Sequence, residues 1–110
     1  MVTAITSANQ FNQAINQDKL VIVNFFATWS GPSNVFSSTF EKFEREYTNA
    51  FDVEFLKLDA DELNSIVDEQ GIRGFPTVIF YKNGSVVDKE IGGNPRAVQE
   101  KINTLAEEYN

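Results

Sequence analysis

Apolar residues follow two different periods along the chain, and each period predicts a different element. Residues 20–26, Leu-Val-Ile-Val-Asn-Phe-Phe, form a nearly continuous run of β-branched and aromatic side chains, which is typical of a strand buried on both faces of a parallel sheet. Further along, aromatic side chains recur at steps of four, three and four residues, at Phe36, Phe40, Phe43 and Tyr47. This spacing predicts one long helix whose aromatic face belongs to the core.

The segments before and after these two elements also carry helix and strand patterns. Ser7, followed by Gln10 three residues later, is a capping-box start for a first helix, and residues 2–5 before it predict a short strand. Residues 53–58 predict a further strand. The apolar positions after that strand predict a short helix that ends near Gly71.

Two turn signals organise the last third of the chain. Asn83-Gly84 lies between strand patterns at 77–81 and 85–91, which predicts a β-hairpin. Asn94-Pro95 predicts the start of a last helix, because Asn caps a helix and Pro fits its first turn. The resulting order β-α-β-α-β-α-β-β-α requires an α/β fold, a central mixed sheet covered by helices on both faces, in a single domain over residues 1–110.

Composition narrows the possible functions. The chain has 110 residues, of which 42% are hydrophobic, so one core can form without a metal or a crosslink. Its 9 Lys and Arg against 16 Asp and Glu give a net charge of −7, which argues against a nucleic-acid partner. No apolar run approaches the roughly 18 residues that span a membrane, and the first residues lack a signal-peptide pattern. We expect a cytoplasmic protein without a membrane partner.

The chain contains neither His nor Cys, which excludes the usual zinc sites and the His-assisted nucleophiles. The acidic run at residues 59–62 lacks the spacing of a calcium loop, and we expect Asp61 in it to cap the following helix instead. No metal and no cofactor are therefore expected.

The most specific motif is Trp29-Ser30-Gly31-Pro32-Ser33, directly after the apolar run. It has the frame of Trp-Cys-Gly-Pro-Cys with an oxygen in place of each sulfur. Together with other segments in matching order and spacing, it resembles the thioredoxin family over essentially the full length of the chain. The other segments are 23–28, Phe40-Glu41-Lys42, Lys57-Leu58-Asp59-Ala60-Asp61, Gly71-Ile72-Arg73-Gly74-Phe75-Pro76-Thr77, Phe80-Tyr81-Lys82-Asn83-Gly84 and Gly92.

The resemblance implies the thioredoxin fold and the function of a protein disulfide oxidoreductase, which exchanges a dithiol for a disulfide in redox homeostasis. It implies a monomer whose partners are oxidised client proteins and a thioredoxin reductase. Residue 30 is expected at a helix N-terminus, where the helix dipole favours a thiolate in the family. Gly31 and Pro32 would keep positions 30 and 33 within one turn.

The resemblance also implies a shallow groove for an extended client segment. Phe75-Pro76 is similar to the family's cis-proline loop, which presents the backbone of the residue before Pro for strand-like pairing. Gly74, Phe75 and Gly92 would line the groove, and Trp29 would shield it as an apolar wall.

Three departures from the family pattern bear on the chemistry. Ser30 and Ser33 replace both cysteines, and a serine hydroxyl cannot form a disulfide. Asn24 stands where the family has a buried Asp, and its amide cannot titrate. Lys57 matches the family's Lys near that Asp and has lost this charge partner. The redox cycle is therefore impossible for this chain.

Two interpretations stay open. Because the three replaced positions carry near-isosteres while the rest of the motif is intact, the sequence favours Cys-to-Ser replacement in a thioredoxin that natively carries the dithiol. The alternative is a naturally redox-dead, thioredoxin-like binding module that holds client proteins in the cis-proline groove. A serine hydrolase built on Ser30 or Ser33 is disfavoured, because no base is available to activate the hydroxyl.

Overall fold

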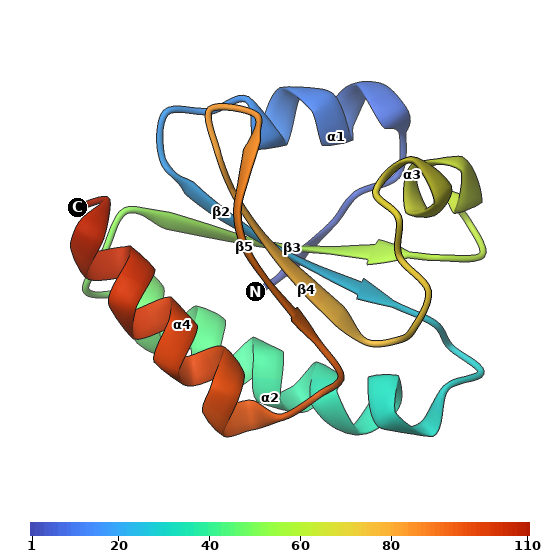
Figure 1. Ribbon diagram of the computed structural model, residues 1–110. Helices are drawn as coiled ribbons and strands as arrows, with labels where there is room; N and C mark the ends of the chain where they lie inside the picture. Colours follow the sequence, from blue (N-terminus) through green and yellow to red (C-terminus); the bar gives the residue numbers. More distant parts are fainter.

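A five-stranded mixed sheet forms the centre of the molecule, in a computed structural model that describes residues 1–110 (Figure 1). The strand order is β1-β3-β2-β4-β5. β3 runs parallel to β1 and β2, whereas β4 runs antiparallel to β2 and β5. The strands are β1 (Thr3–Ala4), β2 (Leu20–Phe26), β3 (Val53–Asp59), β4 (Thr77–Lys82) and β5 (Ser85–Ile91).

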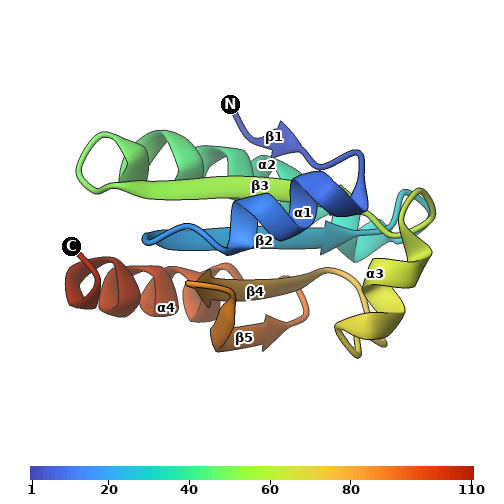
Figure 2. The ribbon, with the colours of Figure 1, turned by 90° about the horizontal axis from the view of Figure 1, so that it is seen from above.

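Helices cover both faces of the sheet, as the sequence predicted. α1 (Ala8–Ile15) and α3 (Asn64–Glu69) pack on one face, and α2 (Gly31–Thr48) and α4 (Pro95–Glu108) pack on the other (Figures 1 and 2). Each face has its own hydrophobic core. No helix combines the length and the apolar composition that crossing a membrane requires.

β2 contributes to both cores, which explains its continuous apolar sequence. Its side chains alternate, so Leu20 and Ile22 belong to the core under α2 and α4, whereas Val21, Val23 and Phe25 belong to the core under α1 and α3. All five are fully buried. By the same alternation, residue 24 faces α2.

The helix starts and the turn form as the sequence predicted, except that one hydrogen bond of the first helix cap has a different donor. The aromatic face of α2 is buried in the core. Ser7 Oγ accepts a hydrogen bond from the Gln10 N–H at 3.1 Å, but Gln10 Oε1 accepts from the N–H of Thr6, at 2.7 Å, rather than from that of Ser7. At the hairpin, Asn83 and Gly84 both have positive φ, 53° and 82°, as a two-residue turn of type I′ requires.

The prediction that Asp61 caps the third helix is wrong. α3 is preceded by Leu63, which makes no side-chain capping bond. Asp61 Oδ1 instead accepts a hydrogen bond from the indole Nε1 of Trp29 at 3.4 Å. The carboxylate is therefore directed toward the loop that precedes α2, because the indole N–H lies within its reach.

Candidate functional site

Ser30 is the N-terminal cap of α2. Its backbone is extended, with φ −96° and ψ 116°, and its Oγ accepts a hydrogen bond from the Ser33 N–H at 3.3 Å. Pro32 stands in the first turn of the helix, where its missing N–H costs no helical hydrogen bond. Position 30 therefore meets the positive end of the helix dipole, and its side chain is only 9% exposed.

Ser33 lies behind Ser30 and is fully buried. Its Oγ accepts a hydrogen bond from the backbone N–H of Ala27 at 3.2 Å. Neither this hydroxyl nor that of Ser30 bonds to a carboxylate or an amine, because each uses backbone groups as its partners. Without a base to take the proton, neither hydroxyl is activated as a nucleophile.

The loop before β4 faces Ser30. The Phe75–Pro76 peptide bond is cis, and the Ser30 hydroxyl donates to the Phe75 carbonyl at 3.4 Å. The Trp29 ring packs edge-on against the Phe75 ring, with centroids 5.8 Å apart, and remains 68% exposed. Gly92 donates its N–H to the Pro76 carbonyl at 2.8 Å. The structure thus brings these predicted groove residues together.

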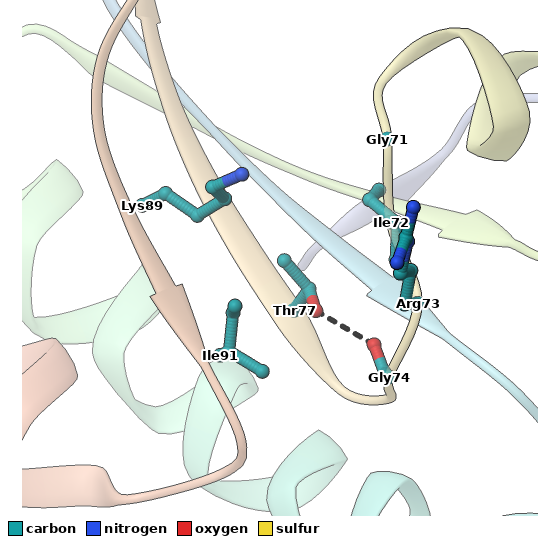
Figure 3. Close-up of a pocket in the computed structure, with 7 residues that line it drawn as sticks. All are labelled: Gly71, Ile72, Arg73, Gly74, Thr77, Lys89 and Ile91. Carbon is teal, nitrogen blue, oxygen red and sulfur yellow. Dashed lines mark hydrogen bonds between the residues drawn. The ribbon is translucent and has the colours of Figure 1, made fainter.

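One backbone group of this loop is left without a partner. The Phe75 N–H has no acceptor within the chain, so an extended segment can pair with it. The carbonyl of neighbouring Gly74 accepts the Thr77 hydroxyl at 2.7 Å (Figure 3). This bond holds the loop in place directly before β4.

Asn24 and Lys57 are direct neighbours on the paired strands β2 and β3. Both line a cavity of about 190 Å³ between the sheet and α2, together with Ser37 and Glu41. Asn24 is 2% exposed, and its Oδ1 has no hydrogen-bond partner. Lys57 is half-buried and forms no ion pair. A buried acceptor therefore stands unsatisfied at the position where the sequence resemblance implies a carboxyl group.

The cavity connects to the Ser30 turn through one turn of α2. Ser37 Oγ donates to the Ser33 carbonyl at 3.0 Å, so the cavity begins one helical turn beyond Ser33. The predicted residues thus form two neighbouring groups. One is gathered around Ser30 and Phe75, where the sequence predicts a client groove, and the other lines the cavity with Asn24 and Lys57.

No group of three or more Asp or Glu side chains is arranged to hold a metal ion. Sequence reasoning missed two features of the site. One is the contact of Asp61 with the Trp29 indole. The other is a cavity beside Gly74 that carries Arg73 and Lys89 (Figure 3). The alternation of side chains along β5 does not by itself predict the second feature, because the β4–β5 ladder has an irregularity at Phe80 and Tyr81.

Comparison with known proteins gives a consistent result. The family model described as Thioredoxin matches residues 2–104. Thioredoxin-1 of Saccharomyces cerevisiae is 42% identical over 93% of this chain and 96% of its own length. Thioredoxin 1 of Plasmodium falciparum is 38% identical over 96% of this chain and 99% of its own.

Solved structures agree in fold. The thioredoxin of Malassezia sympodialis superposes with a TM-score of 0.91 at 38% identity, covering 96% of this chain and 91% of its own. A cysteine-to-serine mutant of Entamoeba histolytica thioredoxin superposes with a TM-score of 0.84 at 29% identity, covering 94% of this chain and 99% of its own. The chain has the thioredoxin fold and belongs to the thioredoxin family.

Proposed function

We propose that this chain is the serine form of a thioredoxin, a protein-disulfide oxidoreductase that keeps its client groove but cannot exchange disulfides. The observation that carries the proposal is the position of Ser30. It stands at the N-terminus of α2, within hydrogen-bond distance of the Phe75 carbonyl. A thiol at this place would be stabilised as a thiolate by the helix dipole and the free N–H groups of the first turn.

The chemistry proposed for the dithiol form follows from this geometry. A thiolate at position 30 attacks one sulfur of a client disulfide, forms a mixed disulfide and expels the other client sulfur as a thiolate. A thiol at position 33 then attacks the mixed disulfide, which releases the reduced client and leaves a disulfide between positions 30 and 33. A thioredoxin reductase would return the two electrons.

The present chain stops before the first of these steps. Its two hydroxyls stay protonated, and an oxygen cannot form the mixed disulfide. Ser30 still caps the helix and Ser33 still accepts from Ala27, so the groove keeps its shape without the sulfurs. Non-covalent contact with clients is what remains to this chain.

Replacing both serines in a Ser30→Cys/Ser33→Cys variant tests the proposal. We expect it to catalyse the reduction of insulin by dithiothreitol, whereas the chain itself stays at background. The matched control is Ser7→Cys/Gln10→Cys, because Ser7 is also a helix N-cap with its partner three residues on. This control has the spacing and the helix but not the cis-proline loop, so it is expected to be much slower.

A folded double variant that is no faster than this control would contradict the proposal. The naturally redox-dead binding module would then be the better account of the groove. The cytoplasmic location, the monomeric state and the reductase remain predictions.

A further inference from the structure

The basic residues of this acidic chain fall into two groups. Of its nine Lys and Arg side chains, five form ion pairs with carboxylates. The other four, which form none, are Arg45, Lys57, Arg73 and Lys89. Arg73 and Lys89 lie 16 positions apart in the sequence but line one cavity of about 340 Å³ beside the cis-proline loop (Figure 3).

The alternation of β5 explains why Lys89 has no partner, although acidic residues flank it. Asp88 and Glu90 point to the opposite face, toward α4, where Lys101 Nζ lies 3.1 Å and 3.2 Å from their carboxylates. Lys89 points with Ile91 to the cavity face. The acids of β5 are thus neutralised on one face, and its base is left free on the other.

The opposite wall of the cavity is the segment that leads into the groove. It is formed by residues 71–74, and Arg73 extends from it with an exposed side chain (Figure 3). Ile91, which is 66% exposed, belongs to the same β5 wall as Lys89. A Cβ added at Gly74 would lie 3.9 Å from Ile91 Cγ2, so the two walls are in close approach at this point.

The cavity adjoins the loop that is proposed to bind clients. Gly74 lines the cavity, and the next residue, Phe75, presents the unpaired N–H at the groove. An extended segment that pairs with Phe75 therefore continues over Gly74 toward Ile91 and the two cations. The chain as a whole carries an excess of negative charge, whereas this cavity brings two cations without ion pairs together, so a free carboxylate finds a complement here.

We propose that this cavity is a subsite for an acidic side chain of the client. An Asp or Glu of the extended segment lies between Arg73 and Lys89, and an apolar neighbour covers Ile91. This inference rests on the proposed function, because it extends the same groove. It makes acidic residues near the client's cysteine a feature that the chain selects.

The test measures covalent capture of short peptides by the Ser30→Cys variant. Each peptide is built from alanine and carries one cysteine, which forms a mixed disulfide with thionitrobenzoate. One Glu is placed in turn at each position near this cysteine, and a matched peptide carries Gln at the same position. The protein thiolate attacks the peptide sulfur, a protein–peptide disulfide forms, and the coloured thionitrobenzoate thiolate leaves with the electron pair. The rate of colour release reports capture.

We expect a Glu at one position to react about fivefold faster than Gln at that position, which is the size expected for two partly solvated charge pairs. The preference should vanish when Arg73→Gln and Lys89→Gln are added, and it should shrink at high salt. It should persist with Arg45→Gln, which removes an exposed unpaired cation on α2, away from the cavity.

Equal rates for Glu and Gln peptides at every position would overturn the subsite. So would a preference that survives the loss of both cations. A peptide with neither Glu nor Gln distinguishes a wrong acidic subsite from a wrong proposed function. If it reacts faster with Ser30→Cys than with a Ser7→Cys variant, the groove stands without the acidic subsite. If it does not, the groove itself is wrong.

Discussion

Ser33 and Ala27 are joined by a buried hydrogen bond, in which the hydroxyl oxygen accepts from the backbone N–H at 3.2 Å. Both residues are fully buried. Ala27 is the first residue beyond β2, so its N–H has left the strand ladder and depends on this side chain. The bond ties the first turn of α2 to the end of the central strand, and it sets the path of the loop that carries Trp29.

Removing the hydroxyl should therefore lower stability. Ser33→Ala leaves the Ala27 N–H buried without an acceptor, and we expect a loss of about 1–2 kcal/mol in the free energy of unfolding. Urea denaturation measures it. Ser38→Ala on the same helix is the control. Both variants gain the helix propensity of alanine over serine, but Ser38 is exposed, so its loss leaves no buried group without a partner. Equal effects of the two substitutions would show that the Ser33 bond contributes nothing.

Asn24→Asp should make stability depend on pH. The side chain is 2% exposed, and burial raises the pKa of a carboxyl group above its unfolded value of about 3.9. Between the two pKa values the folded state binds more protons than the unfolded state, so stability falls as pH rises above about 4. Urea denaturation between acid and neutral pH, with the unchanged chain as control, measures the added slope. A variant that gains stability with rising pH would instead show that Lys57 overcomes the burial.

Asp18 should stabilise the hairpin turn in a pH-dependent way. Its carboxylate accepts hydrogen bonds from Lys82 at 2.5 Å and from Asn83 at 3.2 Å, and these bonds, with the charge of Lys82, lower the pKa of Asp18 from 3.8. A lowered pKa gives stability that is present above pH 3.8 and is lost as pH falls through the folded value. Asp18→Asn should thus melt below the unchanged chain at neutral pH and approach it in acid. A difference that stays constant with pH would contradict this.

Gly84→Ala should destabilise the fold more than Gly71→Ala. Both glycines have positive φ, 82° and 70°, so both variants adopt a backbone conformation that alanine disfavours, at a cost of about 1 kcal/mol each. Only at Gly84 does the added Cβ clash, since it would lie 2.2 Å from Asn16 Oδ1. The melting temperatures of the two variants measure this difference, because both carry the backbone strain and only Gly84→Ala adds the clash with Asn16. Equal melting temperatures would show that Asn16 moves aside without cost.

Local pattern was enough to predict most of the fold. The apolar run at residues 20–26 and the aromatic stripe from Phe36 to Tyr47 report burial directly, and Asn83-Gly84 has the positive φ values that the turn requires. The cis peptide bond before Pro76 was expected from the family resemblance rather than from periodicity.

Features that depend on tertiary neighbours were not predicted. Asp61 was assigned to a helix cap because nothing in the sequence places the Trp29 indole beside it. The cavity of Arg73 and Lys89 depends on which side chains of β5 face the loop. That choice is set by an irregularity in the β4–β5 ladder at Phe80 and Tyr81, and a shift of one residue reverses the faces of a strand.

The two outer strands of the sheet have a consequence for self-association. An exposed edge offers unpaired backbone groups to other molecules, and long, flat, apolar edges promote aggregation. Here one edge, β1, has only two residues, and the other carries Asp88, Lys89 and Glu90 in sequence along β5. Both edges are therefore poor templates for another copy of the chain. Under the proposed function, main-chain pairing with a client is therefore directed away from the sheet edges and toward the loop at Phe75.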